Sequence, residues 1–191
     1  MKRITLFLIA AFFATSGMAQ TADEAAAMKA WQDFMTPGEV HRMMAGWDGE
    51  WTTTNKMWME PGAPPQTTTG TCVNKMLLGG RYQESRFSTT AMNMPFEGIG
   101  TTAYDNAKKQ FVTTWVDNMG TGIMMLRGSW NAASKSMTLS GTCTDPSSGK
   151  DMKVREVYTI QDDNNQLMEM WMTDPKTKKE FKSMEVAFRR K

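Results

Sequence analysis

The chain has very little of the residue types that most often build catalytic and metal sites. It contains one histidine, His41, and two cysteines in 191 residues. No Cys–His cluster, H-E-x-x-H motif or G-x-S-x-G nucleophile elbow occurs in it. These shortages argue against a zinc hydrolase and against a Ser–His triad, and we expect His41 to pack near a helix.

The sequence also lacks any run of about 18 apolar residues, the length that a membrane-spanning helix needs. A shorter apolar run, residues 4–14, follows Lys2 and Arg3 and precedes the small residues Gly17 and Ala19. This layout is typical of a secretory signal peptide. We expect residues 1–19 to be cleaved and the mature chain to be exported, periplasmic or secreted, without further membrane insertion. An uncleaved anchor is the alternative, which the shortness of the run disfavours.

No strong excess of either charge is present. The chain has 22 Lys and Arg and 20 Asp and Glu, and cleavage would remove two of the basic residues, Lys2 and Arg3. The mature protein would then be formally neutral. A neutral protein lacks the basic footprint of a nucleic-acid binder, so we expect no nucleic-acid partner.

The two cysteines, Cys72 and Cys143, both end a Gly-Thr-Cys tripeptide. In an oxidising compartment such a pair is a candidate disulfide. Two separate buried thiols are the alternative, because a sequence does not define the Cβ geometry that a disulfide requires. The sequence leaves both possibilities open.

From residue 49 onward the chain has the rhythm of an all-β protein. Segments rich in Thr, Val, Tyr, Phe, Trp and Met are separated by clusters of Gly, Pro, Asn and Asp. The predicted strands lie near 49–60, 66–77, 81–90, 96–104, 110–117, 122–130, 136–143, 152–160, 166–173 and 180–189. Short connections favour antiparallel hairpins, and about ten strands in succession favour closure, which removes sheet edges.

We therefore predict an all-β fold, an antiparallel up-and-down β-barrel of about ten strands. A two-sheet sandwich is the alternative. Residues 20–47 have helical spacing and predict a short helical lead before a single barrel domain, residues 48–191.

The stretch 96–122 imitates a nicotinamide site. It holds a G-x-G at Gly98 and Gly100, and a Y-x-x-x-K at Tyr104 and Lys108. A dinucleotide fingerprint needs a third Gly where a strand turns into a helix, and Ala103 stands in its place. Asp105-Asn106 favours a turn. We read two strands joined by a turn, and we expect no cofactor.

Methionine is abundant, with 20 residues in the chain. Alternate spacing, as in Met168-x-Met170-x-Met172, places thioethers on one face of a strand. Thioethers favour Cu(I) and are also adaptable packing groups, and we favour packing or a soft ligand pocket. Glu156 and Glu169 lie on adjacent predicted strands, where hydrolase chemistry would need them about 5–10 Å apart. Solvated or ion-paired carboxylates are the alternative.

Several motifs together resemble one bacterial family, called domain of unknown function 1579. They are HRMMAGWDGEW (41–51), LLGGRY (77–82), MPFEGIGTTAYDN (94–106), WVDNMGTG (115–122) and MEVAFRR (184–190). The resemblance covers roughly residues 35–190 and implies a calycin-like or lipocalin-like barrel, distantly similar to nitrobindin, with no established activity.

The resemblance also implies a structural device at one end of the barrel. Calycin barrels carry G-x-W on the first strand, and an Arg of the last strand packs across the Trp. Gly49-Glu50-Trp51 matches the first part, and Arg189 or Arg190 would supply the second, with Arg189 as our choice. The similar nitrobindin-like barrels bind haem through a late His, and this chain has none after His41. That mode of haem binding is therefore not expected.

We predict that the barrel binds a small apolar or amphipathic ligand. The predicted ligand-binding residues are Tyr82, Glu84, Arg86, Trp115, Asp117, Arg155 and Glu169. Trp115 would form a flat wall, Arg86 and Arg155 would meet an acidic group, and the carboxylates would pair with them or accept hydrogen bonds. The main alternative is an envelope structural or interaction protein with a filled barrel, since small barrels are often packed solid. A carboxylate-based hydrolase and a Cu(I)-binding protein are less favoured, and we do not expect an enzyme.

Overall fold

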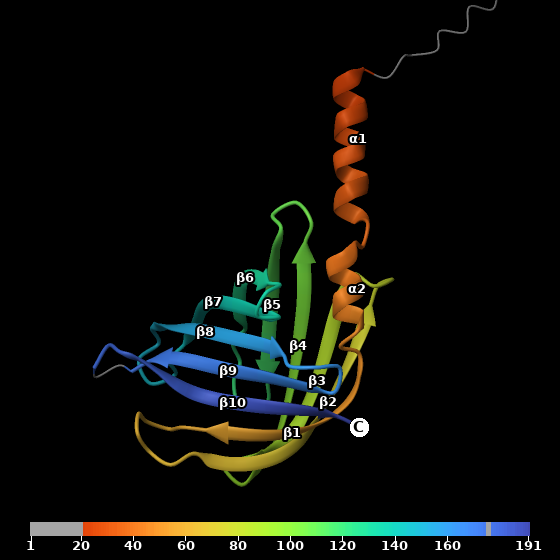
Figure 1. The fold of residues 1–191 in the computed structure, drawn as a ribbon. Helices are drawn as coiled ribbons and strands as arrows, with labels where there is room; N and C mark the ends of the chain where they lie inside the picture. The colour runs from red at the N-terminus through yellow and green to blue at the C-terminus, as the bar shows by residue number, and fades with distance from the viewer. Residues whose placement is uncertain (1–20, 175–176) are drawn as a thin grey trace, which may run out of the picture.

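The computed structural model describes residues 21–174 and 177–191, and the signal peptide expected at residues 1–19 lies outside them. Within the described part, two helices precede ten strands (Figure 1). The helices are α1 (Ala22–Met35) and α2 (Glu39–Ala45). The strands are β1 (Gly49–Met57), β2 (Gln66–Leu77), β3 (Tyr82–Ala91), β4 (Met94–Asp105), β5 (Gln110–Asp117), β6 (Met124–Asn131), β7 (Ser136–Thr144), β8 (Asp151–Ile160), β9 (Asn165–Thr173) and β10 (Glu180–Arg190).

The strands form one closed antiparallel barrel. Each strand pairs with its neighbours in the sequence, and β10 returns to pair with β1. The prediction of an up-and-down barrel is confirmed, and the sandwich alternative is wrong. Local turn chemistry supports this order: Met92 and Asn93, with φ of 50° and 61°, make the two-residue turn between β3 and β4. Two successive positive φ values characterise the hairpin turn whose twist matches that of the strands.

Helix α1 begins at a capping box and projects away from the barrel (Figure 1). The Thr21 hydroxyl accepts from the Glu24 amide, and the Glu24 carboxylate accepts from the Thr21 amide. None of its residues is buried. Asn106 holds the C-terminal end of α1, the end nearer the barrel. Its Nδ2 donates to three carbonyl oxygens at the end of the helix and just after it. No described helix is long and apolar enough to cross a membrane.

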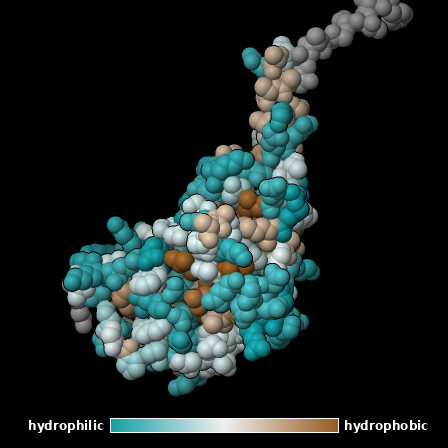
Figure 2. Space-filling view, viewed as in Figure 1, coloured by the Kyte–Doolittle hydropathy of each residue, from teal (hydrophilic) through white to brown (hydrophobic). Residues whose placement is uncertain are grey.

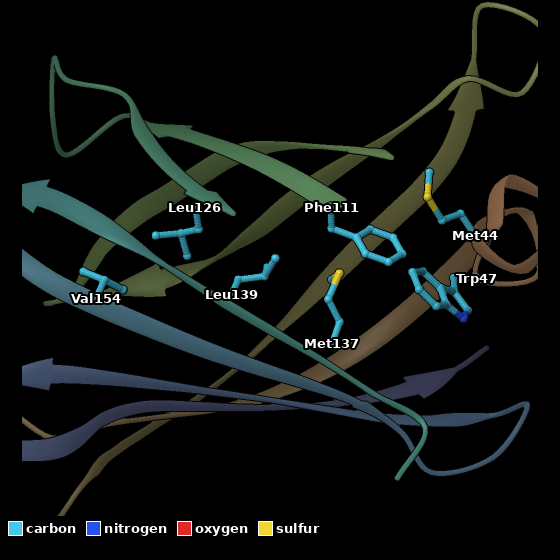
Figure 3. Packing of buried hydrophobic residues seen from close by; sticks show 7 residues of the cluster. All are labelled: Met44, Trp47, Phe111, Leu126, Met137, Leu139 and Val154. Atoms are coloured by element: carbon cyan, nitrogen blue, oxygen red, sulfur yellow. The ribbon is translucent and has the colours of Figure 1, made fainter. Parts of the chain in front are cut away.

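Helix α2 covers one end of the barrel. Met44 and Trp47 are buried and extend toward Phe111 and Met137, which belong to the strands β5 and β7 (Figure 3). The same apolar cluster continues through Leu126, Leu139 and Val154, on the strands β6, β7 and β8. His41 is buried against Tyr104, with ring centroids 6.0 Å apart, and its Nδ1 accepts from the Gly38 amide.

Hydrogen bonds tie this closed end to the strands. The Gln83 side chain donates to the Met44 carbonyl at 2.7 Å and to the Asp48 carboxylate at 2.8 Å. The Trp47 carbonyl accepts from both the Asn74 side chain and the Trp51 indole, each at 3.2 Å. Buried polar groups whose hydrogen bonds are satisfied in this way fix the position of α2 and Trp47 over the end of the barrel, without a cost in stability from unpaired groups.

Arg190, and not Arg189, packs across Trp51. Its guanidinium lies 4.3 Å from the Trp51 ring centroid and donates to the carbonyls of Gly46 and Asp48. Arg190 is opposite Trp51 in the β1–β10 register, so the two side chains share the inner face. Arg189 is one residue out of phase and points to the other face, which corrects our choice of Arg189.

The two cysteines are free thiols in the structure, which favours separate thiols over the candidate disulfide, the two possibilities that the sequence left open. Cys72 lies on β2 in a buried cluster with Trp51, Val186 and Phe188, whereas Cys143 lies on β7. These strands are five steps apart in the ten-strand order, on opposite walls of the barrel. Burial raises the pKa of the Cys72 thiol to about 12.

Candidate functional site: the barrel cavity

A cavity of about 850 Å³ occupies the barrel between its walls. Side chains near α2 form its floor, including Trp47 and Tyr158. Its mouth lies at the other end, where residues of the β3–β4, β5–β6 and β7–β8 connections line it: Met92, Met119, Gly120, Thr121, Gly122, Ile123 and Pro146. The volume lies within the range of about 300–1,000 Å³ that is usual for small-molecule sites.

Three aromatic side chains form one wall. The Phe96 and Trp115 rings stack with centroids 6.4 Å apart and an interplanar angle of 16°. Phe87 meets both rings edge-on, with centroids 6.3 Å away. The three residues come from β3, β4 and β5, which are consecutive strands of the barrel. They present a continuous aromatic surface to the cavity, here called the aromatic wall.

The G-x-G at Gly98 and Gly100 makes room for this wall. A Cβ at Gly98 would overlap the Trp115 indole, and a Cβ at Gly100 would lie 3.4 Å from it. Gly98 and Gly100 stand opposite Asp117 and Trp115 in the β4–β5 register. The two glycines that imitate a cofactor motif therefore let the indole lie flat against the neighbouring strand.

Asp117 fixes the orientation of the indole. The Trp115 Nε1 donates to Asp117 Oδ2 at 2.8 Å, and the Met119 amide donates to Asp117 Oδ1 at 2.9 Å. One carboxylate therefore joins the aromatic wall to the loop at the mouth. Both of its oxygens have partners.

The other walls are rich in methionine. The inner face of β9 carries Met168 and Met170, and the cavity is also lined by Met57, Met124, Met137 and Met184. Unbranched thioether side chains adapt to irregular space and to varied apolar ligands. Within the described residues, no group of three or more His, Cys, Asp or Glu is placed to hold a metal ion.

Glu156 is a carboxylate on this largely apolar surface. It lies on β8 between Leu139 of β7 and Met170 of β9 in the register, and it lines the cavity. No described residue forms a hydrogen bond or an ion pair with its carboxyl group. Burial inside the barrel raises its pKa to about 7. Burial likewise raises the pKa of Tyr158, two residues along β8, whose hydroxyl donates to Gln166.

Of the seven predicted ligand-binding residues, only Trp115 and Asp117 line the cavity. On β3 the inner face carries Gln83, Ser85 and Phe87, so Tyr82, Glu84 and Arg86 occupy the outer face. Tyr82 is 39% exposed. Arg86 Nε donates to Glu84 Oε1 at 2.7 Å, and both side chains remain outside the barrel.

Arg155 and Glu169 also lie on the outer face. The Arg155 guanidinium pairs with Glu180 and lies 4.9 Å from the Trp171 ring centroid. Glu169 accepts from Lys182 at 3.0 Å. Glu169 is opposite Val157 in the register, so Glu156 and Glu169 point to opposite faces and do not form the carboxylate pair that a hydrolase would need. The structure thus corrects the placement of five predicted site residues, because adjacent positions on a strand face opposite ways.

Three features of the cavity were not predicted from the sequence: Phe87, Phe96 and the position of the Glu156 carboxyl inside the barrel. A usable signal exists at Trp51, which the G-x-W motif assigns to the interior. Directly paired residues share a face, and the register runs from Trp51 to Cys72, Phe87, Gly98 and then Asp117. If the inward position of Trp51 is carried across the paired strands to Phe87, the adjacent residue Arg86 must face the outside of the barrel.

The mouth carries exposed apolar side chains. Met92, Met119 and Ile123 are 57%, 38% and 69% exposed and belong to loops that line the cavity. Figure 2 shows, for the face seen in Figure 1, a largely hydrophilic surface on which hydrophobic residues occur in small groups. The entrance to the cavity is therefore partly apolar.

Among the comparisons with known proteins, a family model gives the family and one solved structure supports the fold. The family model described as protein of unknown function (DUF1579) matches residues 36–190. Among solved structures, the crystal structure of Rv2717c from M. tuberculosis is similar with a TM-score of 0.61 at 12% identity, covering 82% of this chain and 99% of that one. A redesigned β-barrel has a TM-score of 0.42 at 14% identity, covering 78% and 96%. No curated protein matches. The chain belongs to the family of proteins of unknown function called DUF1579.

Proposed function

We propose that this protein binds a small apolar or amphipathic ligand inside the barrel, without transforming it. The observation that carries the proposal is the cavity of about 850 Å³, lined by the aromatic wall and by methionines, with a mouth at one end. A filled barrel would have large side chains in that space. Here most of the cavity surface is apolar, and threonine, asparagine and glutamine side chains place polar groups within it, a composition that suits an amphipathic ligand.

The layout of residues 1–19 supports the further proposal that the protein acts after export, in the periplasm or outside the cell. An exported carrier or sensor of an apolar compound would need an enclosed apolar space and a route into it. The exposed apolar residues of the mouth suit such a route.

A fluorescent probe tests the proposal directly. N-phenyl-1-naphthylamine, which is uncharged and apolar, should bind saturably at one site per chain with increased emission. Gly98→Leu should weaken binding by about tenfold or more, because the new side chain would push the Trp115 indole into the ligand space. Ser85→Phe, on the inner face of β3, should do the same without replacing a glycine.

Ile99→Phe is the matched control, since Ile99 neighbours Gly98 on the same strand and is 37% exposed on the outer face. Arg86→Met and Arg155→Met, also on the outer face, should leave probe affinity unchanged. Circular dichroism and thermal unfolding would establish that each variant is folded. If the folded parent protein does not bind the probe, or if the folded interior variants bind it as tightly as the parent, the filled-barrel alternative is favoured.

A further inference from the structure

We propose that the cavity selects amphipathic amines, with Glu156 binding the ammonium group while the apolar part of the ligand contacts the aromatic wall and the methionines. This inference rests on the proposed function and adds the chemical class of the ligand. It follows from the sign and the pairing of the charges that line the cavity.

Three cavity-lining residues have an acidic or basic side chain: Lys56, Asp117 and Glu156. Lys56 lies in the outward phase of β1, and its ammonium donates to Glu185 at 2.9 Å. The remaining two are acids. A ligand with a carboxylate would find no described basic side chain free in the cavity, and both acids would repel it.

The two acids differ in what already satisfies them. Asp117 accepts from the Trp115 indole and from the Met119 amide, one bond on each oxygen. Glu156 accepts from no described residue. A carboxylate has about four acceptor sites and an ammonium has three donors, so a protonated amine complements Glu156 in both charge and hydrogen bonding.

The surroundings of Glu156 strengthen this preference. Its register neighbours, Leu139 and Met170, are apolar, and the titratable group that interacts with it is Tyr158 on its own strand. Tyr158 supplies no positive charge. Burial alone makes ionisation of Glu156 costly, with a pKa of about 7. A ligand ammonium would offset that cost by supplying the missing counter-ion.

The placement of the walls sets the form of the ligand. Glu156 lies midway along β8, and Phe87 lies on β3, five steps away in the ten-strand order, on the opposite wall. The aromatic wall continues from there onto β4 and β5. A molecule with an amine at one end and an alkyl or aromatic body can therefore reach both features across the cavity.

Matched probes test the inference. Decylamine, decan-1-ol and decanoate have the same chain and differ in head group, and each would be titrated against bound N-phenyl-1-naphthylamine at pH 8. We expect decylamine to bind tightest and decanoate weakest. The isosteric variant Glu156→Gln should reduce the affinity for decylamine by about tenfold or more, with little change for decan-1-ol. Glu169→Gln is the matched control on the outer face of the next strand, and it should retain the preference for the amine.

The outcomes separate the two proposals. If the three compounds displace the probe equally well, the cavity binds ligands but does not select amines, and the inference is overturned while the proposed function stands. Equal weakening of all three in Glu156→Gln would make Glu156 a structural part of the wall and would also overturn it. If neither the probe nor any decyl compound binds, the proposed function itself fails.

Discussion

The two ends of this barrel are built on opposite principles. At the closed end, Trp51 and Met44 are fully buried, and side chains of the barrel bind the carbonyls of the α2 segment. At the mouth, apolar side chains such as Ile123 are exposed on loops, and the walls behind them enclose the cavity. The first arrangement stabilises the fold, whereas the second leaves apolar surface uncovered at a cost in stability.

Under the proposed function, this contrast predicts that the closed end contributes mainly to stability and the mouth mainly to ligand exchange. Changes at the closed end should alter the free energy of unfolding, and changes at the mouth should alter ligand exchange. Glu156 lies between the two ends and should affect both. Four predictions test this division.

Trp51→Ala should have the largest effect. It removes a fully buried indole, its hydrogen bond to the Trp47 carbonyl and the surface on which Arg190 packs. We expect a loss of about 3–5 kcal/mol in the free energy of unfolding, measured by denaturant titration. Trp31→Ala is the matched control, because Trp31 is 62% exposed on α1 and should change stability by less than about 0.5 kcal/mol. Similar losses in both variants would contradict the contrast.

Arg190→Met should have the next largest effect. It removes charge-assisted hydrogen bonds to the Gly46 and Asp48 carbonyls and the contact with the Trp51 ring. We expect a loss of about 2 kcal/mol in the free energy of unfolding. Arg189→Met, one residue away on the outer face, should be nearly neutral. Thermal unfolding of the two variants side by side would decide which arginine closes the barrel.

Glu156→Gln should change how stability depends on pH. The carboxyl has a pKa of about 7 in the folded protein against an ordinary value of 4.5, so the folded state holds more protons between these values. Stability of the parent protein should therefore fall as pH rises from about 4.5 to 7. The mouth admits water, so we expect a fall of about 1–2 kcal/mol.

The variant lacks this contribution. Between pH 4.5 and pH 8, its free energy of unfolding should therefore fall by less than that of the parent protein. The comparison cancels the exposed carboxylates, whose pKa values are lowered, such as Glu180. Parallel stability curves for the two proteins across this range, from urea titrations, would show that Glu156 is not enclosed as described.

Ile123→Ser should have the smallest effect on stability. Ile123 is 69% exposed at the mouth, so the free energy of unfolding should change by less than about 0.5 kcal/mol. Stopped-flow release of N-phenyl-1-naphthylamine should nevertheless change in rate, because the side chain lies on the path out of the cavity. A loss of stability comparable with that of Arg190→Met would show that the mouth also supports the fold.

Much of the fold was predictable because its signals are local. The ten strand segments and their turns follow from β-rich runs and punctuating residues, and short connections leave few alternatives to neighbouring antiparallel pairs. The family resemblance supplied the pairing of Trp51 with an arginine. The choice between Arg189 and Arg190 failed because adjacent positions of a strand face opposite ways.

The candidate site was harder to predict because both faces of several strands carry apolar residues. On β9, the outer face has Leu167 and Trp171, and the inner face has Met168 and Met170. Either face is compatible with a barrel interior by composition alone. Only closure of the sheet, which depends on long-range pairing, decides the phase of each strand and hence separates Glu156 from Arg155.

The pairing of β1 with β10 also has a consequence for how the chain reaches its native state. Residues that meet there are far apart in the sequence, as for Lys56 and Glu185, which are separated by 129 positions. Neighbouring hairpins can form early, but this last seam requires nearly the whole barrel sequence to be present. Loop-closure entropy makes such contacts late and slow. Until the seam closes, β1 and β10 each have an unpaired edge, so the interval before closure is when the chain is most prone to aggregate.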